Sequence, residues 1–167
     1  PASYRFDFGT ATSPVASGFT QVTGGMTYNA ARGYGWLSGT VAARDRAAGS
    51  DLLRDLNFTT LATFAVDVPA GSWDVTISIA DAKVAHDQMG FSIEDTSSGT
   101  YALLAGESRV VTSRIAVADG QVTLLLDDLA GRVVVAKVVR GERAEGPEEL
   151  DREADLLAEQ IARVREE

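Results

Sequence analysis

Hydrophobic and polar residues alternate one by one through much of residues 1–140. The pattern is longest in Ser72–Ala80, and it recurs in Thr63–Val68 and Val122–Leu126. A period of two residues is typical of β-strands, because successive side chains of a strand point to opposite faces of the sheet. We therefore expect antiparallel strands in which one face is buried and the other is wet or differently packed.

Short turn sequences separate these runs. Pro69-Ala70-Gly71 and Asp119-Gly120 each lie between two alternating runs, and we interpret both as hairpin turns because Pro, Asp and Gly favour tight turns. Residues 10–50 are rich in Gly and Ala and weakly periodic, so we expect long surface loops there. Many short strands separated by turns predict an all-β sandwich rather than a βαβ fold.

Residues 141–167 follow a helical period instead. Gly146-Pro147-Glu148-Glu149 is typical of a helix start, where proline is tolerated and carboxylates are favoured. Apolar residues then recur three and four positions apart, at Leu150, Ala154, Leu157, Ile161 and Val164. We predict a sandwich domain over 1–140, followed by an acidic linker and an amphipathic α-helix over 141–167. The apolar stripe of this helix would dock on the sandwich, bind a protein partner or a second copy, or belong to a linker.

Composition narrows the possible functions. The chain of 167 residues has a net charge of −9; residues 1–140 carry 11 basic and 14 acidic side chains, and the remainder carry 4 and 10. Neither part offers the basic surface that nucleic acid requires. The absence of cysteine excludes disulfides and thiolate metal sites, and the apolar runs are too short for a membrane span. Because the chain begins at Pro1, we expect it to be a piece of a longer polypeptide.

The titratable residues do not indicate an enzyme. His86 is the single histidine, and the sequence contains neither a Gly-x-Ser-x-Gly elbow nor a Gly-Asp-Ser motif, so we expect His86 to hydrogen-bond within its loop or to contact a ligand. Adjacent carboxylates on a strand point to opposite faces and do not form a glycosidase pair. Asp127 and Asp128 follow a strand; they would either face solvent or supply oxygens to a calcium ion.

An aromatic cluster gives the clearest hint of a ligand. Tyr28, Tyr34 and Trp36 precede the charged run Arg44-Asp45-Arg46. Sugars stack their C–H faces on aromatic rings and pair their hydroxyls with charged side chains, although Tyr34 and Trp36 would serve equally well as core residues under a loop. The candidate ligand-binding residues are Tyr34, Trp36, Arg44, Asp45, His86 and Asp87.

Several motifs occur here in a characteristic order: Phe6-Asp7-Phe8-Gly9, Gly18-Phe19-Thr20-Gln21-Val22, Gly33-Tyr34-Gly35-Trp36 and Phe64-Ala65-Val66-Asp67-Val68. Across residues 4–140 the chain resembles the galactose-binding-like β-sandwich found ahead of rhamnogalacturonan acetylesterase-type SGNH esterases and in large bacterial surface proteins. The resemblance implies a jelly-roll sandwich related to malectin and carbohydrate-binding modules, with an accessory or adhesive role outside the cytoplasm. The esterase's catalytic domain is not in this chain, so its activity does not carry over.

The sequence therefore predicts a non-catalytic carbohydrate-binding or adhesive module of a larger secreted or cell-surface protein. The alternative is a structural module that binds no sugar and associates with protein through Leu150, Leu157, Ile161 and Val164.

Overall fold

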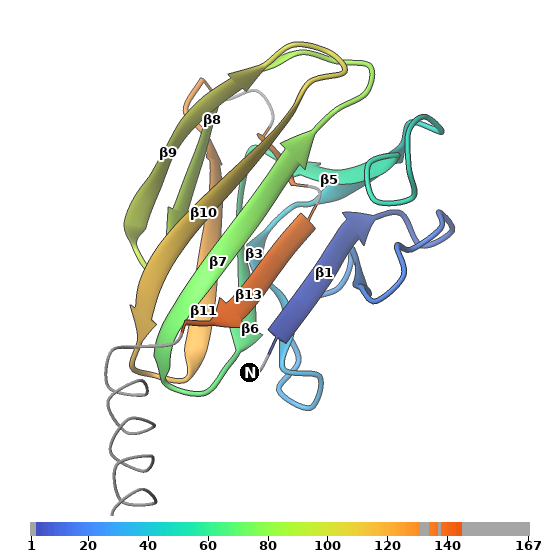
Figure 1. Cartoon of the computed structure of the whole chain (residues 1–167). Helices are drawn as coiled ribbons and strands as arrows, with labels where there is room; N and C mark the ends of the chain where they lie inside the picture. The colour runs from blue at the N-terminus through green and yellow to red at the C-terminus, as the bar shows by residue number, and fades with distance from the viewer. Residues whose placement is uncertain (1–2, 131–133, 137, 145–167) are drawn as a thin grey trace, which may run out of the picture.

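Two five-stranded sheets pack face to face and form a β-sandwich (Figure 1). The computed structural model describes residues 3–130, 134–136 and 138–144, which contain strands, turns and loops and no helix. The first sheet contains, in spatial order, β10 (Ser108–Val117), β7 (Gly71–Ala80), β13 (Val138–Arg143), β1 (Ser3–Gly9) and β2 (Thr20–Thr23). The second contains β3 (Tyr34–Gly39), β6 (Leu61–Asp67), β11 (Gln121–Asp128), β8 (His86–Ile93) and β9 (Thr96–Leu103). A small third sheet contains β12 (Val134–Ala136), β5 (Asp55–Thr59) and β4 (Ala42–Asp45).

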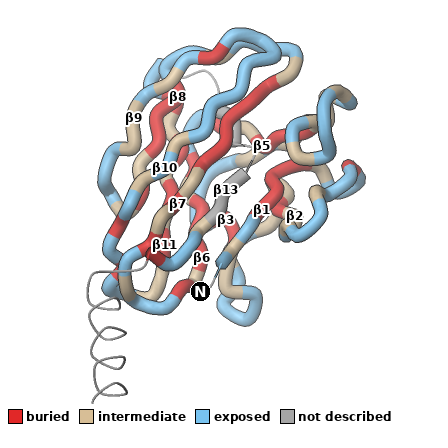
Figure 2. The backbone as a smooth tube through the Cα atoms, viewed as in Figure 1, coloured by how far each residue is buried: buried red, intermediate tan, exposed pale blue. Residues whose placement is uncertain are grey.

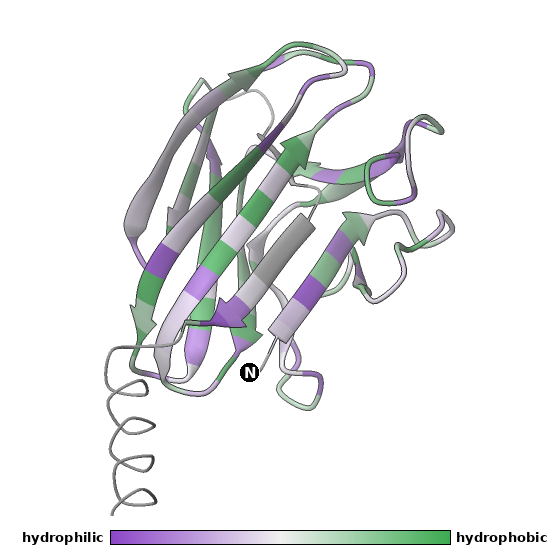
Figure 3. Cartoon of the chain, viewed as in Figure 1, coloured by the Kyte–Doolittle hydropathy of each residue, from purple (hydrophilic) through white to green (hydrophobic). Residues whose placement is uncertain are grey.

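The period-two pattern of the sequence becomes the two faces of each strand. Figure 3 shows alternating apolar and polar bands along β1 and β7, and Figure 2 shows the buried residues gathered between the sheets. In β7 the alternating residues Trp73, Val75, Ile77 and Ile79 are buried. Burying one large aliphatic side chain stabilises the fold by about 1.5–3 kcal/mol. The alternation thus drives the two sheets together and confirms the predicted all-β sandwich with antiparallel sheets. Among the described strands, only β1 and β2 pair in parallel.

Three aromatic rings tie the two sheets together. Phe8 of β1 lies 4.9 Å from Phe64 of β6 and 5.6 Å from Trp36 of β3, measured between ring centroids. Trp36 and Phe64 are 5.3 Å apart, and all three pairs meet edge to face, the arrangement that the ring quadrupoles favour. This contact fixes the spacing between β1 and β3, the two strands that border the first site described below.

The two turns interpreted as hairpins instead cross between the sheets, so that interpretation is wrong. Pro69-Ala70-Gly71 leads from β6 in the second sheet to β7 in the first, and Asp119-Gly120 leads from β10 in the first to β11 in the second. The backbone N–H of Val68 donates to the carbonyl of Gly120 at 2.9 Å, so the two crossings lie side by side. Turn residues specify where the chain reverses, but the sheet that the next strand joins depends on where its apolar face is buried.

The weak periodicity of residues 10–50 predicted long surface loops. The structure also places three strands there: β2, β3 and β4. β2 is too short to display a period, since it has only four residues. In β3 the pairing with β6 shifts register between Trp36 and Ser38, and such an irregularity interrupts strict alternation. The sequence pattern therefore failed to indicate β2 and β3 because of their length and register, and not because of their composition.

The last described strand extends beyond residue 140. β13 pairs with β1 as far as Glu142 and with β7 as far as Arg143. Ala144 is buried, and its N–H donates to the Ser72 carbonyl at 2.8 Å. The predicted C-terminal helix, with its stripe from Leu150 to Val164, lies outside the described residues. Within the described part of the chain, no helix has the length and apolar character needed to cross a membrane.

Candidate functional site

The two aromatic residues predicted to contact a ligand occupy different environments. Trp36 is 4% exposed, and its indole N–H donates to the Thr23 carbonyl at 3.1 Å. Phe8 and Phe64 pack against its ring. Trp36 is therefore a core residue, the alternative that the sequence left open. Tyr34 is half-buried and lies at the start of β3, 4.9 Å from Phe6.

Tight loop packing places Tyr34 at the surface. Gly35 has a φ of 142°, and a Cβ on it would lie 2.6 Å from the Tyr28 backbone. Only glycine allows the segment before β3 to approach so closely. The Tyr28 N–H consequently reaches the Trp36 carbonyl at 2.9 Å. The neighbouring Tyr34 side chain is thereby held at the edge of the sandwich, opposite β1.

A cleft with a volume of about 380 Å³ opens beside Tyr34. We call it the Tyr4–Tyr34 cleft, and its lining includes Ser3, Tyr4, Arg5, Thr20, Arg32 and Tyr34. It opens where β2 ends: β2 pairs with β1 from Phe6 onward, while residues 3–5 of β1 have β13 on their other side. Among the described strands, none covers the free edge of residues 3–5. The cleft therefore combines two half-buried aromatic rings with an unoccupied strand edge.

Two arginines border this cleft. The Arg32 guanidinium lies 5.1 Å from the centre of the Tyr34 ring; its Nε donates to the Tyr34 carbonyl at 3.1 Å, and its Nη2 donates to the Thr27 carbonyl. Arg5 is 4.0 Å from Glu142, and both side chains are about half exposed. Tyr4, Arg5 and Arg32 were not among the ligand-binding residues predicted from the sequence. The alternation Tyr4-Arg5-Phe6 at the start of β1 was visible, but it does not show which strand edge remains uncovered.

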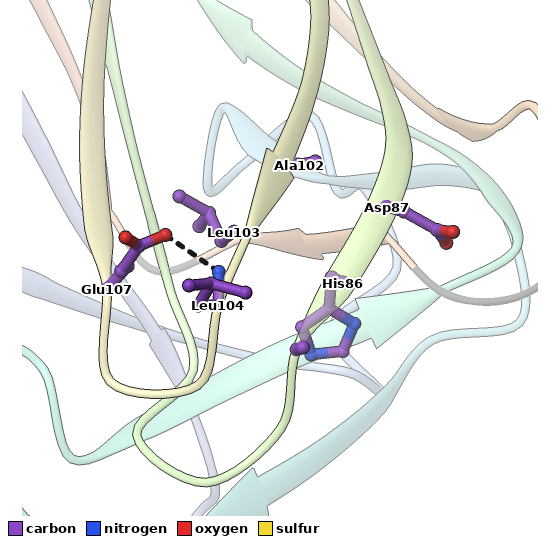
Figure 4. Close-up of a pocket in the computed structure, with 7 residues that line it drawn as sticks. His86, Asp87, Ala102, Leu103, Leu104 and Glu107 are labelled. Carbon is purple, nitrogen blue, oxygen red and sulfur yellow. Dashed lines mark hydrogen bonds between the residues drawn. The ribbon is translucent and has the colours of Figure 1, made fainter.

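His86 and Asp87 line a second hollow, the His86 pocket, of about 310 Å³ (Figure 4). Ala85, Ala102, Leu103, Leu104 and Glu107 complete its lining. The Glu107 carboxylate accepts a hydrogen bond from the Leu104 N–H at 2.7 Å. Figure 4 shows Asp87 and Glu107 on opposite sides of β8, so these carboxylates do not converge. The pocket therefore offers a mainly apolar wall with polar groups scattered around it.

A buried carboxylate fixes the position of His86. Asp81 accepts five hydrogen bonds: two from the Arg46 guanidinium, two from the Lys83 and Val84 N–H groups, and one from His86 Nε2 at 2.9 Å. Burial alone would raise the pKa of Asp81, but the hydrogen bonds from Arg46, His86 and Lys83 outweigh it and lower that pKa. An ionised carboxylate only accepts, so His86 Nε2 carries the proton. His86 thus forms the local hydrogen bond expected of it.

Of the charged run Arg44-Asp45-Arg46, only Arg46 is bonded to Asp81. Asp45 accepts two hydrogen bonds from Arg54, at 3.1 and 2.9 Å, and the next residue, Arg46, binds Asp81. Arg44 is exposed. Asp45 thus binds Arg54 and not the Asp81 carboxylate. The two hollows share no lining residue. Of the six predicted ligand residues, Tyr34 lines the Tyr4–Tyr34 cleft, His86 and Asp87 line the His86 pocket, Trp36 is buried in the core, and Arg44 and Asp45 line neither hollow.

The predicted metal ligands also point in different directions. β11 alternates regularly, so Asp128 is buried with Leu126 while Asp127 faces the other side of the sheet. Asp128 Oδ1 accepts from the Ala130 N–H at 2.8 Å. Among the described residues, no group of three or more His, Asp or Glu side chains is arranged to hold a metal ion.

Comparison with known proteins identifies the fold family. Residues 4–135 match the family of β-agarase/YXIM esterase-like, galactose-binding domain-like sequences. The chain belongs to this family. The galactose-binding-like domain is thereby placed among β-sandwiches of that class, as the resemblance of its N-terminal motifs implied. No curated protein sequence matches it.

Solved structures share the fold. The domain superposes on the YXIM protein of Bacillus subtilis with a TM-score of 0.68 at 19% identity, covering 86% of this chain and 40% of that one. A β-glucuronidase of Bacteroides uniformis gives 0.60 at 12% identity, with coverage of 86% and 18%. The plant receptor-like kinase FER gives 0.56 at 7% identity, with coverage of 86% and 42%. The galactose-binding-like domain thus spans less than half of each of these three chains.

Proposed function

We propose that this domain binds carbohydrate in the Tyr4–Tyr34 cleft, as a non-catalytic module of a larger protein. The observation that carries the proposal is the cleft itself: within a galactose-binding-like fold, it places two tyrosines, two arginines and two hydroxyl side chains around about 380 Å³ of open space. Small-molecule sites commonly combine apolar walls with a few polar groups that fix the ligand's orientation.

Each group has a counterpart on a sugar ring. The half-buried rings of Tyr4 and Tyr34 offer apolar surface to the C–H face of a pyranose. Tyrosine also carries a polar hydroxyl at the end of its ring, which suits a ligand that is apolar on its face and polar at its edge. The Arg32 and Arg5 guanidinium groups can donate to sugar oxygens, as can the Ser3 and Thr20 hydroxyls.

A non-catalytic role is supported by the surroundings of the histidine. A hydrolase of the Ser-His-Asp type requires a histidine within hydrogen-bond reach of a serine, whereas His86 Nε2 is bonded to the Asp81 carboxylate. We also propose that the parent protein is secreted or displayed on the cell surface, where a glycan ligand would be encountered. Labelling of intact and permeabilised cells with an antibody against the domain tests this location; signal only after permeabilisation contradicts it.

The binding test uses the full chain on a glycan array, followed by calorimetric titration with any glycan that binds. We expect Tyr34→Ala to abolish binding while the protein stays folded. The matched control is Tyr101→Ala, because Tyr101 is also half-buried and also lies beneath an arginine, with Arg109 5.6 Å from its ring centre.

A third variant tests the position of the site. His86→Gln changes the His86 pocket, which shares no lining residue with the cleft, and we expect it to leave affinity unchanged. Loss of affinity in His86→Gln with retention in Tyr34→Ala would move the site to the His86 pocket. If no glycan binds the wild-type chain, carbohydrate binding itself is wrong.

A further inference from the structure

The two charged residues that line the Tyr4–Tyr34 cleft are both positive. Arg5 and Arg32 belong to its lining, and no aspartate or glutamate does, although the whole chain carries a net charge of −9. We propose that this cleft selects acidic sugars, whose rings carry a carboxylate or sulfate group, over neutral ones; this inference rests on the proposed carbohydrate site. A local positive potential attracts anionic ligands into a cleft even when the net charge of the protein is negative.

Arg32 is held in place without being neutralised. Its two observed hydrogen bonds go to the backbone carbonyls of Tyr34 and Thr27, which carry no net charge. Within the described chain, no carboxylate lies within 4.0 Å of this guanidinium. The neighbouring Tyr34 ring, 5.1 Å away, further restricts its position. A fixed cation loses little conformational entropy on binding and has full charge available for an anion.

Arg5 supplies a second cation at the rim. Its distance of 4.0 Å from Glu142, with side chains 47% and 60% exposed, indicates a weak surface pair. A ligand anion can therefore replace Glu142 at little cost. Tyr4 and Arg5 are neighbours on β1 and point to opposite faces of the strand, so a ligand at the free strand edge meets an aromatic ring and a guanidinium together.

The same chemistry recognises two kinds of acidic sugar. A guanidinium donates two parallel hydrogen bonds to two oxygens, which fits the carboxylate of a uronic acid and also the oxygens of a sulfate ester. Calorimetric titrations of the full chain with an oligogalacturonide, a sulfated galactan oligosaccharide and a neutral galactan oligosaccharide of matched length separate the two sources. We expect at least one acidic ligand to bind about tenfold more tightly than the neutral one, the change expected for one charged hydrogen bond.

Variants then assign this preference to the two arginines. Arg32→Gln and Arg5→Gln should each reduce the acidic-to-neutral affinity ratio, and the double variant should abolish it. Arg109→Gln is the matched control, because Arg109 also lies over a tyrosine ring, outside the cleft. Glu142→Gln, which removes the weak partner of Arg5, should raise affinity for the acidic ligand. If Arg32→Gln disturbs the loop before β3, Arg5→Gln still tests the proposal, because the ion pair that Arg5 forms with Glu142 is exposed.

The outcomes separate this inference from the function on which it rests. Equal binding of acidic and neutral ligands, or a ratio that survives in the double variant, overturns the charge selection and leaves carbohydrate binding standing. Failure of all three ligands together with an empty glycan array overturns both. Raising the salt concentration should weaken the acidic ligand more than the neutral one, because exposed charges are screened.

Discussion

The guanidinium of Arg46 binds the buried carboxylate of Asp81 through two hydrogen bonds, 2.8 Å from Nε to Oδ1 and 2.6 Å from Nη2 to Oδ2. Arg46 directly follows β4 and Asp81 directly follows β7, so this pair joins the small third sheet to the first large one. The Asp81 side chain is only 1% exposed and that of Arg46 is 19% exposed. A carboxylate buried this deeply is tolerated because its oxygens are occupied by donors.

We expect Asp81→Asn to lower the free energy of unfolding by about 2–3 kcal/mol, because it leaves buried donors facing a neutral amide. Asp74→Asn is the matched control: Arg114 binds Asp74 with the same two-bond geometry, at 2.8 and 2.7 Å, but this pair is exposed. The control should change stability little. Urea unfolding of both variants measures the difference, and equal losses would show that burial of the Asp81 pair adds nothing.

The same pair predicts a pH dependence. The pKa of Asp81 is lowered in the folded state, since hydrogen bonding outweighs burial. A lowered folded-state pKa adds stability above the pKa of the unfolded chain, and this contribution is lost as pH falls through the folded-state value. The stability advantage of the wild type over Asp81→Asn should therefore be full at neutral pH and shrink below about pH 4. Urea titrations at a series of pH values test this, and an advantage that grows toward low pH contradicts it.

The fold was predictable where strands are long and one face is buried. β7 has ten residues and β11 has eight, enough for the alternation to identify a strand and its inner face. β2 and β3 were missed because a four-residue strand and a strand with a register shift lack that alternation. The crossings at Pro69-Ala70-Gly71 and Asp119-Gly120 could not be distinguished from hairpins, because strand pairing is decided by contacts between distant residues.

The candidate site was predictable only in part. Tyr34 stood out by its residue type, and the structure does place it beside a cleft. Trp36, two positions further along β3, looked the same in sequence and faces the same way, but it is buried in the core, whereas Tyr34 at the start of the strand is only half-buried. Arg32 lies only two positions before Tyr34, but Tyr4 joins Tyr34 through folding alone, because it comes from the first strand. No local sequence motif predicts that Tyr4 and Tyr34 lie beside the same cleft.

Trp36 should act through stability rather than through binding. Trp36→Ala removes a ring that is 4% exposed and packed on Phe8 and Phe64, so we expect a loss of about 3–5 kcal/mol in the free energy of unfolding. The fraction that remains folded should bind glycan with unchanged affinity. Thermal unfolding and titration at low temperature measure the two effects; lost affinity without lost stability would make Trp36 a ligand contact after all.

The calcium prediction can be tested at Asp128. Its Oδ2 atom is buried and accepts no hydrogen bond from the described residues, while Oδ1 is bonded to the Ala130 N–H. If this oxygen is a calcium ligand, a hundredfold excess of calcium over the dissociation constant stabilises the wild type by about 2.7 kcal/mol. We expect that gain to vanish in Asp128→Asn and to persist in Asp119→Asn, where the aspartate is exposed. A melting temperature of the wild type that changes neither on addition of calcium nor on addition of a chelator contradicts the prediction.

The extent of the sandwich is tested by two truncated chains, one ending at Arg140 and one at Ala144. The shorter chain loses Gly141 and Glu142, which pair with β1 on one side and β7 on the other, and Arg143, which pairs with β7. It also loses the buried Ala144. We therefore expect it to unfold at much lower urea concentration than the chain ending at Ala144. Equal stability of the two would mean that the last residues of β13 contribute nothing to the sheet.

The full chain compared with the chain ending at Ala144 then isolates residues 145–167. The predicted stripe of Leu150, Leu157, Ile161 and Val164 gains about 1.5–3 kcal/mol for each large side chain that is fully buried, so we expect it to be covered. If it docks on the sandwich, truncation lowers the free energy of unfolding, and both chains sediment as monomers in analytical ultracentrifugation. If it joins two copies, the full chain sediments as a dimer and the truncated one as a monomer, with stability that rises with concentration only for the full chain. A truncation that changes neither mass nor stability contradicts burial of the stripe, and with it the assembly role that is the alternative to glycan binding.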